Sequence, residues 1–203
     1  TVYQVQPYDW EAMLIEVNLL ADWFAPRFKG GALSKQETDQ FVEIWNDLID
    51  QLATSEIRLN LRDFHSPNII WNDDATGNGN HNDQVGLIDF QDAVLGPSAY
   101  DLASLAQDAR VDISVELEKA LVDHYCECRQ SSQFDEIKFR RDYAIMAAQR
   151  ATKILGIFIR LDERDNKPDY LKHLPRMQDY IKRSLGHPIL ASYRQWFERV
   201  IEL

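Results

Sequence analysis

Cysteine is scarce in this chain. Only two of its 203 residues are cysteines. Cys126 and Cys128 lie two positions apart on an expected helix, where their side chains point to different faces, and this disfavours a disulfide between them. His124 could add a third metal ligand, but nothing nearby supplies the fourth that a structural zinc site needs.

Long apolar runs are also missing. No segment approaches the roughly 18 uninterrupted apolar residues that a membrane span requires. The first residues contain neither a basic start nor the apolar core of a signal peptide. We therefore expect a soluble, cytoplasmic chain with no membrane partner.

Positive charge is in short supply. Lysine and arginine number 22 against 33 aspartates and glutamates, so the formal net charge is −11. A nucleic-acid partner would have to find a local basic patch against this field. The two basic groups lie in helix-like segments, where a solvated helix face is the simpler interpretation; they are Lys138 with Arg140 and Arg141, and Lys182 with Arg183. We expect no nucleic-acid binding.

The composition that remains, 45% hydrophobic and 11% aromatic, supports one ordered globular domain. Apolar residues at intervals of three and four predict a helix over roughly residues 9–25, which we expect Pro26 and the Gly30-Gly31 pair to end. A second helix is predicted from Ser34 to about residue 53, because Ser34 and Glu37 have the spacing of a capping box.

Alternating β-branched residues then predict three short strands, at 57–61, 68–71 and 84–89. The polar stretch between the last two suits a hairpin tip. It faintly resembles a calcium loop, although strands flank it and the terminal glutamate is absent.

From residue 96 onward we expect only helices. Ser98 with Asp101 is predicted to cap the first of them, which runs to about 108. The others are predicted at 114–129, 134–161, 169–185 and 188–202. The expected fold is therefore α+β and mainly helical, with one small strand cluster.

Three polar residues stand at the ends of the predicted strands. Asp63 closes the first strand, Asn68 opens the second five residues later, and Asp89 ends the third. Two carboxylates and an amide oxygen form the hard donor set that suits Mg²⁺ together with substrate phosphate. The D-x-x-x-x-N spacing followed by an apolar strand ending in Asp is the arrangement of eukaryotic-like kinases, which indicates phosphoryl transfer.

The stretches "LRDFHSPNIIW" and "GLIDFQDAVLGPSAYDLASLAQDAR" resemble the aminoglycoside phosphotransferase (phosphotransferase enzyme) family. They look most like its cell-wall amino-sugar branch, the N-acetylmuramate/N-acetylglucosamine anomeric kinases. This resemblance implies an ATP-dependent kinase that phosphorylates a hydroxyl of a small amino sugar, with Mg²⁺ as cofactor.

The same resemblance implies a role for each site residue. Asp63 would be the catalytic base, and Asn68 and Asp89 the magnesium ligands. Asp101 would accept backbone hydrogen bonds that hold the catalytic loop. Three further residues lie close enough in sequence to line the sugar side: Arg62, which we assign to loop support, and His65 and Gln91, which we assign to possible substrate contact.

Relatives usually have histidine two positions before the catalytic aspartate, where this chain has Leu61. That histidine mainly orients the loop, so we expect Leu61 to weaken the support without abolishing activity. It also keeps open a degenerate kinase-like binding module as the alternative function.

The resemblance covers essentially residues 1–203 and corresponds to the C-terminal, substrate and magnesium-binding lobe of the family. The N-terminal lobe, which carries the glycine-rich cover and the lysine for ATP, has no counterpart in this sequence. The chain also starts at Thr1 without an initiator methionine, so we expect a piece of a longer protein that is inactive on its own.

Other interpretations remain open at this stage. Asp, Ser, Pro and Asn all favour turns, so Asp63 and Asn68 taken alone also fit a plain turn. His65 also fits a packed loop histidine. Asp63 with Asp89 could serve as the acid and base of a glycosidase, but Asn68 then has no purpose. A metal-dependent hydrolase would show itself by hydrolysis without ATP.

Overall fold

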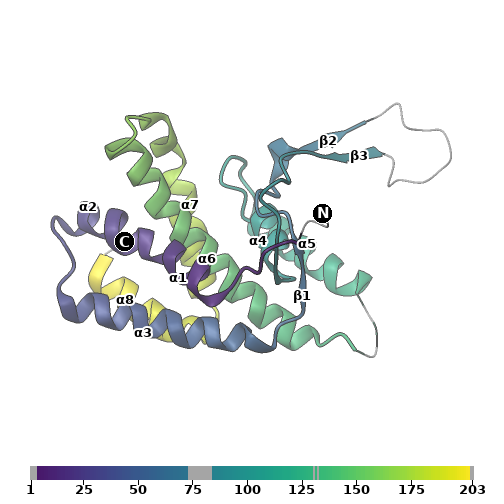
Figure 1. The fold of residues 1–203 in the computed structure, drawn as a ribbon, viewed down its shortest axis with the longest axis horizontal. Coiled ribbons are helices and arrows are strands. Elements are labelled where there is room, and N and C mark those ends of the chain that lie inside the picture. Colours follow the sequence, from purple (N-terminus) through teal and green to yellow (C-terminus); the bar gives the residue numbers. More distant parts are fainter. Residues whose placement is uncertain (1–3, 73–83, 130, 132, 202–203) are drawn as a thin grey trace.

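The structure is a computed structural model that describes residues 4–72, 84–129, 131 and 133–201. Most of these residues are helical, and the strands form two small antiparallel pairs (Figure 1). This confirms the expected mainly helical fold with a small strand cluster. The polar stretch that we interpreted as a hairpin tip lies almost wholly outside the described residues.

The first helix runs further than predicted. It consists of α1 (Trp10–Leu19), a π-helical turn (Leu20–Phe24) and α2 (Ala25–Lys29). Pro26 does not end it, because the π turn closes with Ala25 N–H bonded to the carbonyl of Leu20. Pro26 thus falls in the first turn of a new α segment, where a missing N–H is tolerated. The helix ends at Gly30, which has a φ of 78°.

Helix α3 (Lys35–Gln51) begins as predicted. The Ser34 hydroxyl accepts a hydrogen bond from the Glu37 N–H, and the Glu37 carboxylate accepts one from the Ser34 N–H. A single 3₁₀ turn (Leu52–Thr54) then leads into the strands.

Three predicted strands are confirmed in shortened form, and a fourth was missed. The confirmed strands are β1 (Ile57–Asn60), β2 (Ile69–Trp71) and β3 (Val85–Leu87), and β2 pairs with β3. The missed strand, β4 (Val94–Pro97), pairs antiparallel with β1. The prediction that everything from residue 96 is helical was wrong, because Gly96 and Pro97 belong to β4. Pro97 is the last residue of this strand, where the ladder tolerates its missing N–H.

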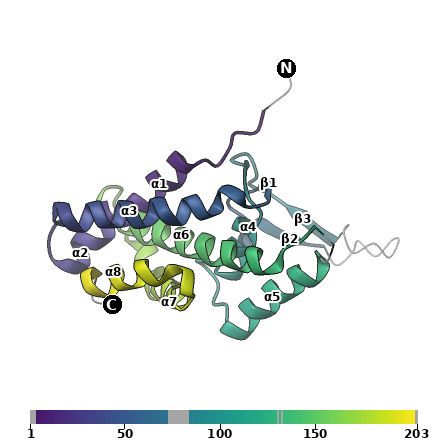
Figure 2. The same cartoon turned by 90° about the horizontal axis from the view of Figure 1, so that it is seen from below.

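The later helices follow the predicted order. They are α4 (Tyr100–Ala106), α5 (Val115–Cys128), α6 (Glu136–Glu163), α7 (Leu174–Leu185) and α8 (Ala191–Ile201). Two of them follow 3₁₀ segments, Pro168–His173 before α7 and Pro188–Leu190 before α8. Figure 2 shows α6 running through the middle of the helical body, with α3 on one side and α7 and α8 on the other.

The core lies around α6 and between α3 and α8. Trp45 of α3 is fully buried against Tyr193 of α8, with ring centroids 4.9 Å apart. Trp196 donates its indole N–H to the carbonyl of Glu37. On the other face of α6, Gly156 meets the backbone of Leu19, so that α1 and α6 approach closely. This rigid body carries the strand cluster at one end (Figure 1).

The predicted cap of α4 is wrong. Its N-cap residue is Ala99, and no side chain caps the helix. The N–H of Ser98 bonds to the carbonyl of Glu56, while the carboxylate of Asp101 turns toward the loop after β1. Ser98 and Asp101 therefore bond to segments distant in the sequence instead of capping α4.

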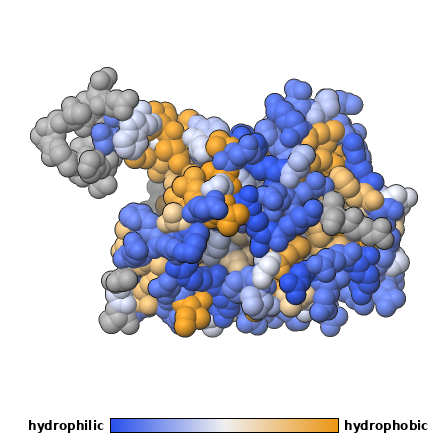
Figure 3. All heavy atoms as spheres, turned by 180° about the vertical axis from the view of Figure 1, so that it is seen from behind, coloured by the Kyte–Doolittle hydropathy of each residue, from blue (hydrophilic) through white to orange (hydrophobic). Residues whose placement is uncertain are grey.

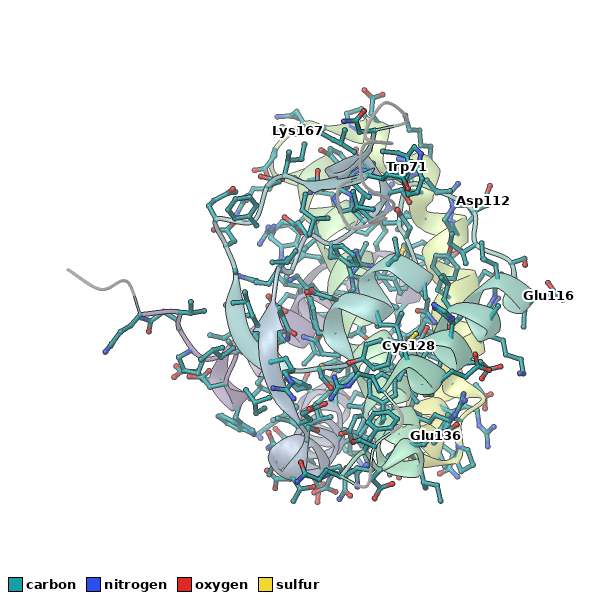
Figure 4. The ribbon with its side chains drawn as sticks, turned by 90° about the vertical axis from the view of Figure 1, so that its right-hand side faces the viewer. Trp71, Asp112, Glu116, Cys128, Glu136 and Lys167 are labelled. Atoms are coloured by element: carbon teal, nitrogen blue, oxygen red, sulfur yellow. The ribbon has the colours of Figure 1, made fainter. Side chains whose placement is uncertain are left out.

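The two cysteines are free, with Cys126 buried and Cys128 exposed on α5 (Figure 4). His124 Nε2 lies 3.5 Å from Cys128 Sγ. Within the described ranges, no three or more His, Cys, Asp or Glu side chains gather as a metal site. None of the described helices combines the length and the apolar character that crossing a membrane demands.

Candidate active site

The loop between β1 and β2 is held at its start by Asp101. One Asp101 oxygen accepts the N–H of Leu61 at 2.7 Å, and the other accepts the N–H of Arg62 at 3.1 Å. Burial raises the pKa of Asp101, and the two backbone hydrogen bonds oppose that rise. The contacts are those that the resemblance implies, and they fix the backbone directly before Asp63.

Arg62 ties the same loop to the helical body. Its φ of 67° is unusual for a residue with a side chain. Its guanidinium bonds to Glu16 of α1 at 2.6 Å, and Lys153 of α6 bonds to the same Glu16 oxygen at 2.7 Å. Burial would raise the pKa of Glu16, but Lys153 and the other donors around it hold that pKa below its usual value. Glu16 therefore links α1 directly to α6 and, through Arg62, both helices to the loop.

A second carboxylate, which the sequence analysis missed, holds the far part of the loop. Asp108, completely buried after α4, accepts the N–H of Ser66 at 2.8 Å and that of Arg110 at 2.7 Å. Burial would raise the pKa of Asp108, but these donors lower it overall. The sequence gives little sign of this role for Asp108, which lies in the segment "SLAQDAR". One partner, Ser66, is 42 residues away, and the other, Arg110, is two residues further along.

The structure brings Asp63, Asn68 and Asp89 together. The Asn68 amide nitrogen donates to the Asp63 carbonyl at 2.9 Å and to the Asp89 carboxylate at 3.3 Å. This arrangement directs the Asn68 amide oxygen away from both partners. Asp89 itself has a φ of 62°, and its other carboxylate oxygen accepts a hydrogen bond from Gln91 at 2.9 Å.

Asp63 also lines a pocket of about 170 Å³, to which Asn68 and Asp89 do not contribute. The loop contributes Arg62 and His65, the segment after α4 contributes Arg110, and α6 contributes one wall. Five residues give that pocket an apolar side: Ile154, Ile157, Phe158, Leu161 and Tyr170. A polar loop thus faces an apolar wall, a common form of small-molecule site.

His65 is buried at the edge of this pocket, and the Arg110 guanidinium lies against its ring nitrogens. Burial and then Arg110 lower the pKa of His65, so the ring is neutral near pH 7. It is thus a packed loop histidine and a lining residue at once. Gln91 is bonded to Asp89 and does not line the pocket.

Sequence comparison places the site in a known context. Residues 6–139, which include the loop and its carboxylate supports, match the phosphotransferase enzyme family. Three proteins similar to this chain are each named N-acetylmuramate/N-acetylglucosamine kinase. That of Caulobacter vibrioides is 33% identical over 194 residues, 96% of this chain and 52% of the relative. That of Neisseria meningitidis is 34% identical over 182 residues, 87% of this chain and 51% of the relative. That of Pseudomonas putida is 31% identical over 191 residues, 91% of this chain and 53% of the relative.

The chain thus spans about half the length of the curated relatives it matches. Since the family match extends over most of the chain and contains the assembled loop with Asp63, Asn68 and Asp89, this chain belongs to the phosphotransferase enzyme family.

Proposed function

We propose that this chain is the substrate and magnesium half of an ATP-dependent kinase that phosphorylates a hydroxyl of an amino sugar such as N-acetylmuramate or N-acetylglucosamine. The observation that carries the proposal is the position of Asp63. Asp63 lines the pocket, and Asn68, which donates a hydrogen bond to the Asp63 carbonyl, also donates one to the Asp89 carboxylate. An acceptor hydroxyl in the pocket and a phosphoryl donor at the two other residues would meet at Asp63.

In this proposal Asp63 accepts the proton of the attacking hydroxyl and orients its oxygen. Asn68 and Asp89 would hold Mg²⁺ once the Asn68 amide turns so that its oxygen, instead of its nitrogen, faces the Asp89 carboxylate. With only a few protein ligands, the ion would rely on donor phosphates and water to complete its coordination, as Mg²⁺ commonly does. When bound, Mg²⁺ neutralises charge on the transferred phosphate.

The loop contacts support this assignment. Phosphoryl transfer depends on positioning more than on covalent chemistry. Asp101 fixes the backbone before Asp63, and Asp108 fixes it after. Leu61, which stands where relatives usually have histidine, still donates its N–H to Asp101. This favours an active kinase over the degenerate binding module that Leu61 left open.

The strand cluster supports a separate lobe for ATP. Large apolar side chains are exposed on both strand pairs and on the segment that follows β3: Ile57, Leu59, Leu95, Ile70, Val85, Leu87, Ile88 and Phe90. Figure 3 shows this apolar surface along the strands and at their base. Exposed apolar areas of this kind mark binding surfaces. We propose that a nucleotide-binding lobe and the base of ATP cover it, beside Asp89.

The test is Asp63→Asn in the gene product that contains this chain, assayed by coupled ATP consumption with each of the two sugars. We expect kcat to fall at least about a hundredfold, because a general base typically contributes 10² to 10⁴. The fold should persist, since the Asp63 contacts to the loop use its backbone. Asp92→Asn, an exposed carboxylate of the same region, is the control. Wild-type turnover in Asp63→Asn would refute the role, and sugar hydrolysis without ATP would favour a hydrolase.

A further inference from the structure

Four basic side chains line the pocket beside Asp63, and they fall into two pairs. Arg62 and Lys153 share one carboxylate, that of Glu16, which offsets only one of their two charges. Arg110 and Arg150 ion-pair with no carboxylate in the part of the chain that the structure describes. The pocket therefore presents positive charge that the chain itself leaves uncompensated at close range.

Arg150 is the more unusual member of the second pair. Its side chain is only 6% exposed, and its one hydrogen bond runs from Nη1 to the carbonyl of Gln107, at 3.1 Å. A guanidinium has five N–H donors, and a buried charge is costly unless it is paired. Burial lowers the pKa of Arg150, with Tyr100, Asp108 and Asp63 opposing at longer range. An anion in the pocket would supply the missing partner.

Arg110 lies at the exposed edge of the same pocket. Its backbone is fixed by the hydrogen bond to Asp108, and its guanidinium lies against the neutral His65 ring. The side chain is thus pre-positioned without being neutralised. Because a fixed guanidinium binds carboxylate in a bidentate manner, little ordering would remain for the ligand to impose.

We propose that Arg110 and Arg150 bind a carboxylate on the sugar acceptor and so select acidic over neutral amino sugars. The inference rests on the proposed function, because it takes this pocket as the acceptor site. The apolar residues of α6 that line the pocket beside Arg150 would contact the alkyl part of the acidic substituent. The incoming phosphate is an alternative anion for the two arginines, but neither proposed magnesium ligand, Asn68 or Asp89, is among the residues that line this pocket.

The experiment measures sugar binding to the 203-residue chain by NMR titration, without nucleotide or Mg²⁺. Three probes separate charge from size. N-acetylmuramate carries a lactyl carboxylate, its methyl ester has the same substituent without charge, and N-acetylglucosamine lacks the substituent. We expect N-acetylmuramate to bind at least about tenfold more tightly than either neutral sugar, as a charge-assisted contact allows.

Arg110→Gln should remove about tenfold from N-acetylmuramate affinity and leave the affinity for N-acetylglucosamine unchanged. Arg194→Gln is the matched control, because Arg194 is exposed on α8 and does not line this pocket. Arg150→Gln should act like Arg110→Gln. If the buried Arg150 variant does not fold, Arg110→Gln still decides the matter, since its side chain is exposed.

Equal affinities for the three probes would overturn the proposal, as would undetectable binding of N-acetylmuramate or an equal loss for the neutral sugar in Arg110→Gln. These outcomes differ from a failure of the proposed function. Selective binding without phosphoryl transfer in the gene product would leave the carboxylate site standing and refute the kinase. Phosphoryl transfer to both sugars without selective binding would support the kinase and refute the carboxylate site.

Discussion

Asp89 has left-handed backbone geometry and yet is not glycine. Aspartate and asparagine tolerate this conformation better than other residues with side chains, and strained positions of this kind concentrate at functional sites. Arg62, beside Asp63, is a second such position. The site thus has a left-handed residue at Asp89 and another next to Asp63, and each is held there by hydrogen bonds from or to neighbouring segments.

Asp89→Asn tests the metal assignment at the scale of one residue. The substitution keeps a side chain that tolerates the left-handed backbone but removes a charged ligand. We expect the Mg²⁺ concentration for half-maximal sugar phosphorylation to rise at least about tenfold in the gene product. A Mg²⁺ titration of the rate measures it, with Asp92→Asn as control. An unchanged Mg²⁺ requirement would place the metal elsewhere.

The sequence predicts those site residues that lie within one local motif. Asp63 and Asn68 share a loop, and Asp89 follows a recognisable strand, so spacing alone indicates that they converge. Arg110, Asp108 and Arg150 escaped notice for a physical reason. Their neighbours come from other segments, and a charged residue in a helix has the pattern of an ordinary surface position until its burial is seen.

At the scale of elements, Gly156 sets the distance between α1 and α6. A Cβ placed there would lie 2.2 Å from the carbonyl carbon and oxygen of Leu19. We expect Gly156→Ala to lower the free energy of unfolding by at least about 2 kcal/mol. The added methyl group would overlap the backbone of Leu19, which cannot move aside as the end of a flexible side chain could. Urea denaturation measures this. Gly31→Ala, with open space around it, should change stability by less than about 0.5 kcal/mol. Equal stabilities would show that the two helices separate freely.

The start of α3 gives a pH-dependent prediction. The hydrogen bond from Lys29, and then that from the Ser34 N–H, lower the pKa of Glu37 from 4.5 to about 2. A lowered pKa stabilises the fold above the unfolded value of 4.5 and loses that effect as the pH falls through about 2. Glutamine can keep the capping box, so Glu37→Gln isolates the charge.

We therefore expect wild type to be more stable than Glu37→Gln at pH 7, with the difference shrinking from about pH 4.5 down to pH 2. Chemical denaturation across this range measures it. Lys29→Met should flatten the same pH dependence, and Glu43→Gln on an exposed position of α3 is the control. A difference that grows as the pH falls would contradict the assignment.

Helix periodicity predicts where most elements lie but not how they are joined. The repeating apolar positions of α3 are visible because that helix buries one side over many turns, and α6 is visible because its apolar residues extend over its whole length. The pairing of β4 with β1 is not visible, since "LGP" favours a turn locally and only the partner strand makes it extended. Pro26 misleads for a similar reason, because the π turn before it depends on packing against α6.

For the whole molecule, we expect this chain to fold alone and yet to transfer no phosphate from ATP at a useful rate. Its helices enclose a continuous core. In the sequence, the paired glycines Gly77 and Gly79 lie between two strands, not before a helix where a phosphate cradle would need them. Thermal unfolding by circular dichroism should show one cooperative transition, while a coupled assay with either sugar shows no sustained turnover. Sustained phosphorylation by the chain alone would show that its ATP site is complete.

One wall of the pocket beside Asp63 comes entirely from a single face of α6: Arg150, Lys153, Ile154, Ile157, Phe158 and Leu161. The groups proposed for chemistry lie on a different stretch of chain, between residues 63 and 89. In the proposed function, this wall of the acceptor pocket is therefore encoded apart from the reacting groups, although Arg62 and His65 of the loop line the pocket as well. A gene library randomised at five of those codons, with Lys153 kept because it bonds to the Glu16 that holds Arg62, would change what the pocket accepts and leave residues 63–89 as they are. Natural variation at the same five positions would let related proteins differ in the sugars that they bind while they keep the same reaction.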